Sequence, residues 1–373
     1  MKVLTGNLLE SEAQTLVNTV NCVGIMGKGI ALQFKKSFPE MFVDYAQRCA
    51  NGQVQLGRPY LFRGLTAPWI LNFPTKDHWR SLARLSDIED GLDYLEQNYR
   101  EWGITSIAVP PLGCGNGQLE WRVVGPTLYR HLERLDIPVE LYAPAGTPMG
   151  QLEISFLDSD QGESSDATPS QDPEWVKPAW VALAEIVHRL DEQPYHWPIG
   201  RTIFQKIAYV ATALGLPTGL KFERGSYGPF SGDVKRMQSR LMGNGLLSED
   251  RRGSMLNVTV GSTFEDAQKS YSSDIRRWDD QIERTVDLFM RISNTDQAEL
   301  VATVIYTANE LNDNNHQPSE TDVYDAVLSW KARRKPPVEP SRVTETIRTL
   351  SAQNWINVQS VDGRGCDESA SFA

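Results

Sequence analysis

The chain has 373 residues and a formal net charge of −11, so it is long enough for two domains with separate cores. No apolar run approaches the roughly 20 residues that span a bilayer, and the acidity argues against a general binder of nucleic acid, whose backbone it would repel. The four cysteines include no Cys-x-x-Cys pair, which argues against a zinc site or a disulfide framework and predicts a cytoplasmic protein.

Residues 1–147 alternate strand-like and helix-like runs. The strand candidates are 17–20, 60–63, 69–73, 104–109 and 139–142, and the helix candidates are 30–38, 82–102 and 119–135. Alternation of this kind predicts an α/β domain, in which helices cover a sheet.

An acidic segment follows the first domain. Residues 151–175 contain seven Asp/Glu and no Lys/Arg, whereas residues 1–150 contain 15 against 14 and residues 176–373 contain 26 against 23. The composition of 148–174 cannot bury much apolar surface, so we predict a flexible linker there. Such a charge run could imitate a DNA backbone, but a solvated spacer is the simpler interpretation.

The second half, 175–360, shows mainly helical periodicity. Helices are predicted at 175–187, 201–214, 233–242, 275–293, 295–312, 320–329 and 341–353, with a short strand at 256–260 that could pair with 219–224. A mainly α-helical second domain is therefore expected, followed by a disordered tail at 361–373.

Two glycine-rich turns carry most of the chemical information. The first, Asn21-Cys22-Val23-Gly24-Ile25-Met26-Gly27-Lys28-Gly29, joins a predicted strand to a predicted helix, and so does the second, Gly113-Cys114-Gly115-Asn116-Gly117. Such turns expose backbone N–H groups at the positive end of a helix dipole, which suits phosphate. The spacing matches neither a P-loop nor the dinucleotide fingerprint. Two such turns can clamp a diphosphate from both sides.

These turns resemble those of macrodomains, the ADP-ribose-binding three-layer α/β/α fold with a mixed sheet. The resemblance covers about residues 1–145 and also rests on Thr5-Gly6-Asn7-Leu8 and Leu16-Val17-Asn18-Thr19-Val20-Asn21. The runs 21–29 and 72–80 most resemble the DarG family, the DNA ADP-ribosyl glycohydrolases that serve as antitoxins in DarTG toxin–antitoxin systems.

The second half resembles the Panacea (SocA-like) antitoxin domain. The similar runs are Phe204-Gln205-Lys206-Ile207-Ala208-Tyr209 and Glu223-Arg224-Gly225-Ser226-Tyr227-Gly228-Pro229-Phe230-Ser231. This resemblance implies a domain that binds the cognate DarT-type toxin. Without it, the Tyr-Gly-Pro run is simply a turn between packed elements.

Lys76 is the main catalytic candidate. The resemblance implies that a lysine on this loop attacks the anomeric carbon of the distal ribose, which an amine with a lowered pKa does well; the plain alternative is a solvated loop lysine. The related animal enzyme has an aspartate where Gly117 stands. Glu120 is the nearest carboxylate, and Asp77 is expected to cap the following helix.

The resemblance also implies an ADP-ribose site. Asn21 is expected to bind the distal ribose and Asn7 the adenine, unless they form a turn and a helix cap. The full candidate set is Asn7, Leu8, Asn21, Gly27, Lys28, Gly29, Ile30, Gly113, Cys114, Gly115, Asn116 and Gly117. Cys22 and Cys114 have no histidine partner nearby in the sequence and are interpreted as small packing residues.

His78, Trp79 and Arg80 flank the candidate nucleophile. An aromatic ring beside a cation suits a contact with single-stranded DNA, although Trp79 could be a core residue and Arg80 a surface charge. The leading hypothesis is an antitoxin that removes ADP-ribose from thymidine in single-stranded DNA, without metal or cofactor, and that binds its toxin through the C-terminal domain. The alternatives are a glycohydrolase or deacylase acting on ADP-ribosylated protein or O-acyl-ADP-ribose, and a non-catalytic ADP-ribose reader.

Overall fold

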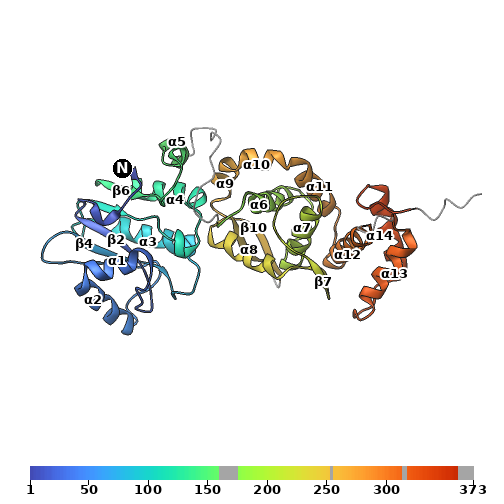
Figure 1. Ribbon diagram of the computed structural model, residues 1–373, viewed down its shortest axis with the longest axis horizontal. Helices are drawn as coiled ribbons and strands as arrows, with labels where there is room; N and C mark the ends of the chain where they lie inside the picture. The colour runs from blue at the N-terminus through green and yellow to red at the C-terminus, as the bar shows by residue number, and fades with distance from the viewer. Residues whose placement is uncertain (159–174, 253–254, 313–316, 360–373) are drawn as a thin grey trace, which may run out of the picture. The chain divides into compact units, whose positions relative to one another are not determined.

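The computed structural model describes residues 1–158, 175–252, 255–312 and 317–359 (Figure 1). The chain divides into two compact units: the first comprises residues 1–185, 236–249 and 259–279, and the second comprises 186–235, 250–258 and 280–373. The acidic centre of the predicted linker, 159–174, and the predicted tail, 361–373, lie outside the described residues.

A six-stranded sheet of order β1-β6-β5-β2-β4-β3 forms the centre of the first unit. Its strands are β1 (Lys2–Leu4), β2 (Thr15–Asn21), β3 (Tyr60–Phe62), β4 (Trp69–Lys76), β5 (Ile107–Val109) and β6 (Val139–Tyr142). All neighbouring strands pair in parallel except β3, which is antiparallel to β4. The prediction of an α/β domain with a mixed sheet is confirmed, and β1 is an addition to it.

Helices cover both faces of this sheet (Figure 1). On one face Leu16 and Val20 of β2 share a buried cluster with Phe34 of α1 (Gly29–Ser37) and Met41 of α2 (Pro39–Ala50). On the other face, α3 (Leu85–Asn98) packs on β4 and α4 (Trp121–Glu133) packs on α3 and β6. The first unit therefore has three layers.

Residues 148–158, where a flexible linker was expected to begin, fold back on the first unit. They form a 3-10 turn, Met149–Gln151, and the short helix α5 (Ile154–Leu157), which packs on α4. Leu157 is fully buried, and the indole N–H of Trp121 donates to the Gln151 carbonyl at 3.4 Å. Leu157 supplies the apolar anchor that the composition of the segment as a whole obscures.

Later segments of the chain also belong to the first unit. They include the start of α6 (Pro178–Asp191), most of α8 (Gly232–Gly243), α9 (Phe264–Ser270) and α10 (Ser272–Arg277). Helix α9 packs on α4, where Arg130 forms an ion pair with Asp266 at 2.7 Å. The predicted helix at 275–293 is two helices, since α10 ends and α11 (Asp279–Met290) begins on either side of Trp278.

The second unit is mainly helical, as predicted. Its helix α12 (Thr295–Asn312) packs against α7 (Arg201–Ala213), α13 (Glu320–Lys331) and α14 (Pro340–Ala352). A hairpin of β7 (Glu223–Gly225) and β8 (Gly228–Phe230) lies on α12. Strand β10 (Met255–Val260) pairs with β9 (Leu247–Arg252), so the predicted pairing with 219–224 is wrong.

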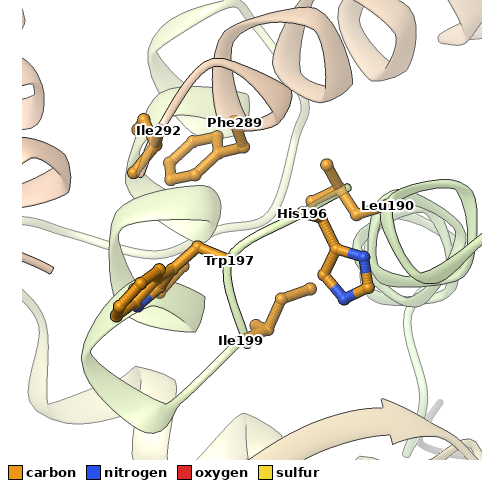
Figure 2. Close-up of a pocket in the computed structure, with 7 residues that line it drawn as sticks. Leu190, His196, Trp197, Ile199, Phe289 and Ile292 are labelled. Atoms are coloured by element: carbon orange, nitrogen blue, oxygen red, sulfur yellow. The ribbon is translucent and has the colours of Figure 1, made fainter. Parts of the chain in front are cut away.

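The second unit also contains a small pocket (Figure 2), which is mainly apolar and includes the imidazole of His196 and the indole of Trp197 in its lining. Its lining residues are Leu190, His196, Trp197, Ile199, Ile203, Phe289 and Ile292. Within the described ranges of the chain, no helix has the length and apolar character needed to cross a membrane.

Candidate active site

The candidate residues gather at the edge of the sheet where parallel strands end. Strand β2 lies between β4 and β5, and Asn21 at the end of β2 is in register with Lys76 at the end of β4. The first glycine loop follows β2, and the second follows β5. In open α/β sheets, ligands bind outside the carboxyl ends of the strands, so the topology brings both loops and Lys76 to one place.

The amide of Asn21 organises the first loop. Its Nδ2 donates to the Ile25 carbonyl at 2.6 Å, and its Oδ1 accepts from the Val23 N–H at 3.0 Å. The hydroxyl of Tyr45, a fully buried residue of α2, donates to the Asn21 carbonyl at 2.8 Å. Asn21 therefore positions the loop, as its turn-forming alternative anticipated, and a ribose contact would use its remaining amide hydrogen.

The start of α1 offers backbone donors. Gly29 is the first residue of the helix, with φ +58°, and the extended residue before it, Lys28, makes no side-chain capping bond. The first N–H groups of a helix have no intrahelical acceptor. Gly29 and Ile30 can therefore donate to an anion at the positive end of the helix dipole. The side chain of Lys28 is exposed.

The second loop lies against the first. A Cβ on Gly29 would be 3.1 Å from Nδ2 of Asn116, so the two glycine turns adjoin each other. Gly113 has φ +75°, and a Cβ there would lie 2.5 Å from Leu119 and 2.7 Å from Ile88. Gly115 has φ +69° but faces open space. The loop is thus packed at Gly113 and open at Gly115, where N–H groups can meet a ligand.

Lys76 contacts the second loop. Its half-buried side chain extends from the end of β4, and Nζ donates to the Asn116 carbonyl at 2.6 Å. Burial disfavours the charged form and lowers the pKa of Lys76 below its ordinary value of 10.5. A larger fraction of neutral amine is then available at a given pH, as a nucleophile requires.

Two carboxylates, Glu120 near Gly117 and Asp77 beside Lys76 in the sequence, have other partners. Oε2 of Glu120 accepts from the Trp175 N–H at 2.9 Å. Asp77 does not cap the following helix, because α3 begins at Leu85 with Arg84 as its N-cap residue. Instead, the Ser81 side chain and the His78 N–H stabilise the ionised form of Asp77 and lower its pKa. Both carboxylates are thus held by neighbouring groups.

His78, Trp79 and Arg80 form a stacked group directly after this strand. The His78 and Trp79 rings are 5.4 Å apart, and the Arg80 guanidinium lies 4.5 Å from the centre of the Trp79 ring. Trp79 is 44% exposed, so it is not a core residue. The group presents an aromatic face and a positive charge beside Lys76.

Asn7, Leu8 and the cysteines have structural roles. Asn7 caps a 3-10 turn, accepting from the Leu9 N–H at 3.2 Å. Leu8 is buried in the core against α1 and α2, so only its backbone could reach a ligand. Burial raises the pKa of the Cys22 thiol to about 11 and raises that of Cys114 as well. Both thiols stay protonated near neutral pH, as expected of packing residues.

Sequence reasoning missed two contributors. Tyr45 lies on α2, a helix that was not predicted, and nothing near it in the sequence points to the first loop. The Asn116 carbonyl is a backbone acceptor whose link to Lys76 depends on the path of the loop. Finding either one needed the three-dimensional fold.

Comparisons with known proteins show which family the chain is similar to. Residues 17–128 match the family model of the Macro domain. A DNA ADP-ribosyl glycohydrolase of Thermus aquaticus is 34% identical over 311 residues, which cover 82% of this chain and 81% of that protein. A DNA ADP-ribosyl transferase-DNA ADP-ribosyl glycohydrolase fusion protein of Thermosipho africanus is 37% identical over 180 residues, covering 43% of this chain and 46% of that protein.

A solved structure, the macrodomain of Mycobacterium tuberculosis DarG, is 46% identical and covers 39% of this chain and 97% of that chain, with a TM-score of 0.38. The identity to the Thermus aquaticus protein extends over four fifths of both chains and so reaches well beyond the macrodomain. The chain belongs to the DarG family of macrodomain DNA ADP-ribosyl glycohydrolases.

Proposed function

We propose that this chain hydrolyses the bond between ADP-ribose and DNA, and that the Lys76 amine is the nucleophile. The observation that carries the proposal is the place of Lys76. Its half-buried side chain lies at the carboxyl end of β4 and contacts Asn116 of the second glycine loop, where this loop adjoins the first. A diphosphate held by the N–H groups of both loops puts the sugar beyond it at this edge of the sheet.

The chemistry needs one nucleophile and water. The neutral amine forms a bond to the anomeric carbon of the distal ribose while the bond to the base breaks, and the base leaves with the electron pair and takes up a proton. The sugar ring opens to a Schiff base on Nζ. Water then hydrolyses the Schiff base, which releases ADP-ribose and regenerates the amine.

For the substrate we propose ADP-ribose linked to thymidine in single-stranded DNA. The exposed Trp79, stacked with His78 and Arg80 beside Lys76, supports a contact with an unpaired base. Bases stack on aromatic side chains in single-strand-binding proteins irrespective of sequence. A protein substrate linked through glutamate would not need this group.

The first test compares the full chain with its Lys76→Ala variant on a short DNA strand that carries ADP-ribose on thymidine. We expect the variant to release ADP-ribose more slowly by on the order of 10³-fold or more, because a nucleophile is lost. Calorimetry should show that it still binds free ADP-ribose. Loss of ADP-ribose binding would make Lys76 a ligand contact, and wild-type activity on glutamate-linked protein alone would favour the alternative enzyme.

We further propose that the C-terminal part binds a DNA ADP-ribosyltransferase toxin, through the hairpin of β7 and β8. The Thermosipho africanus relative joins a transferase and a glycohydrolase in one chain, which supports a partner of this kind. The hairpin exposes Tyr227 to 68% and Phe230 to 47%. Exposed aromatic residues are frequent anchors of protein interfaces.

The backbone of this hairpin is held by buried donors. Three side chains of α7 and α13 donate to its carbonyls: Lys206 to Pro229 at 2.8 Å, Lys331 to Ser226 at 3.3 Å, and the Trp330 indole to Gly225 at 3.0 Å. As whole residues, Lys206 and Lys331 are only 2% and 4% exposed. A backbone fixed in this way presents its aromatic side chains with little entropy left to lose on binding.

Replacing both Tyr227 and Phe230 by Ala in the full chain tests this surface. We expect the double variant to lose co-purification with the transferase, while its rate of ADP-ribose release stays within about twofold of wild type. Lys76→Ala is the matched control, since it should keep the complex and lose the hydrolysis. A double variant that still holds the transferase would place the interface elsewhere.

A further inference from the structure

The turn Gly243-Asn244-Gly245, at the end of α8, lies against the second glycine loop within the first unit. Asn244 is 1% exposed. Its Nδ2 donates to the Gln118 carbonyl at 3.3 Å, and its Oδ1 accepts from the Glu120 N–H at 2.6 Å. One side chain therefore spans the stretch that joins the glycine loop to α4.

The residue that Asn244 holds has an uncommon conformation. Gln118 has φ +64°, in the left-handed region that residues with a Cβ rarely adopt. Its N–H donates to the Gly115 carbonyl at 3.0 Å, and Arg240 of α8 donates to its side-chain oxygen at 3.2 Å. Backbone strain of this kind persists where surrounding contacts fix it. Of the groups that fix Gln118, Arg240 comes from α8 and Asn244 from the turn that follows it.

The two glycines allow this close approach. A Cβ on Gly243 would lie 3.0 Å from the Ala83 carbonyl, and one on Gly245 would lie 3.3 Å from Leu85. Ala83 in turn donates its N–H to the Gly117 carbonyl at 3.0 Å. The turn thus adjoins both the segment that leads from Lys76 into α3 and the end of the second glycine loop.

We propose that Asn244 is a positioning residue for the ADP-ribose site. It fixes Gln118 and Glu120, and thereby the approach of the Gly115–Gly117 backbone to the diphosphate and of the Asn116 carbonyl to Lys76. The inference rests on the proposed function, because it assigns a role relative to that site. It makes the second glycine loop depend on a residue more than a hundred positions later in the chain.

Fixing the far end of the loop matters because the near end is already fixed. Gly113, four residues after the end of β5, is enclosed by Leu119 and Ile88, while Gly115 faces open space. Without Asn244, the Gln118 carbonyl and the Glu120 N–H lose these partners, and the left-handed residue can relax. The N–H groups of the loop would then sample several orientations, and a ligand would have to order them on binding.

The test is made on the full chain with Asn244→Ala, Asn244→Asp and, as a matched control, Asp266→Asn. The control weakens the Arg130–Asp266 pair, which also ties α4 to a later helix but lies away from the glycine loop. ADP-ribose binding is measured by calorimetry, release from DNA by steady-state kinetics, and stability by thermal unfolding.

We expect Asn244→Ala to weaken ADP-ribose binding by about tenfold and to raise KM in parallel, since two hydrogen bonds that order the loop are lost. Asn244→Asp keeps an acceptor for the Glu120 N–H, so its ADP-ribose affinity and KM should lie between those of Asn244→Ala and wild type. Asp266→Asn should leave binding and KM within about twofold at a comparable loss of melting temperature. If Asn244→Ala fails to fold, the inference is tested by comparing the ADP-ribose binding of Asn244→Asp with that of Asp266→Asn.

The inference is overturned if the Asn244 variants bind ADP-ribose as wild type does. It is equally overturned if Asp266→Asn weakens binding as much as they do, because the effect then reflects general stability around α4. A wild-type chain that neither binds nor releases ADP-ribose would overturn the proposed function itself, an outcome distinct from both.

Discussion

At the scale of single residues, the burial of Lys76 affects both the stability of the fold and the reactivity of the amine. Because burial lowers its pKa, the unfolded chain binds more protons than the folded chain between the lowered value and 10.5. The free energy of unfolding therefore increases as pH rises from the lowered pKa to 10.5. At lower pH the lysine is charged in both states, and the folded protein has to hold this charge in a half-buried position. The same shift increases the fraction of reactive amine.

This predicts the pH dependence of the reaction. We expect the single-turnover rate of ADP-ribose release to rise with pH and to level off below 10.5, the ordinary pKa of lysine. Rates measured across a pH series, with Lys28→Ala as a control at an exposed lysine of the same site, would show whether the inflection belongs to Lys76. A plateau reached only above the ordinary value would contradict the assignment.

Two glycines of the second loop differ in a way that substitution can measure. Gly113→Ala should lower the free energy of unfolding by about 2–4 kcal/mol, since the methyl group meets Leu119 and Ile88 and the φ is positive. Gly115→Ala should lower the free energy of unfolding by about 1–2 kcal/mol, because its methyl group meets no neighbour and only the strain of the positive φ remains. Urea unfolding of both variants checks this, and equal losses would disprove the packing difference.

Motifs and the family resemblance singled out the candidate site but not the part that each of its residues plays. The sequence pattern singled out Lys76 and both glycine turns, and the structure brings them together. It left open whether Asn21 binds ribose or forms a turn, and it did not place Leu8 in the core. Those roles depend on partners such as Tyr45 and α2 that are distant in the sequence, so periodicity and spacing carry no signal for them.

At the scale of elements, the hairpin of the second unit depends on a buried ionic network. Glu299 accepts from Lys331 at 2.6 Å and from Arg334 at 3.2 Å, and the Glu299 and Lys331 side chains are 5% and 2% exposed. Removing one partner of such a pair leaves a buried charge without compensation. A single substitution in this network is therefore expected to destabilise the unit.

Glu299→Gln tests the network. We expect it to lower the free energy of unfolding by about 3–5 kcal/mol, as is usual when a buried pair is broken. Glu310→Gln is the matched control on the same helix, because its pair with Arg224 is exposed and should contribute less than about 1 kcal/mol. Chemical denaturation of both variants measures the difference, and similar losses would show that the buried pair contributes little.

The elements themselves were predictable where periodicity was strong. The core strands of the sheet and helices such as α3, α4, α7 and α12 lie close to their predicted ranges. Helix α2 was missed because Pro39 ends α1 and begins α2 with no intervening loop. The pairing of β10 was wrong because hairpin partners depend on register and packing, which a short apolar run does not specify.

At the scale of the whole molecule, the net charge of −11 limits how the chain can hold DNA. An acidic protein gains little from general attraction to phosphate, so recognition must come from the ADP-ribose site and from local contacts. Trp79, with Arg80 4.5 Å from the centre of its ring, is the exposed aromatic group beside Lys76. Stacking of a flanking base there would be insensitive to salt.

This predicts one result for Trp79→Ala and another for the protein that keeps Trp79. Affinity for ADP-ribosylated single-stranded DNA should fall by about tenfold, the effect of losing one stacked base, while affinity for free ADP-ribose stays unchanged. The dependence of wild-type DNA affinity on salt should be shallow, a log–log slope of about −1 to −2, because only a few phosphates are neutralised. Fluorescence anisotropy over a salt series measures both, using the catalytically inactive Lys76→Ala background so that the DNA stays modified.

A steep slope would reveal an extended basic contact that the charge distribution does not provide. Equal losses of affinity for free ADP-ribose and for modified DNA would assign Trp79 to the nucleotide site instead.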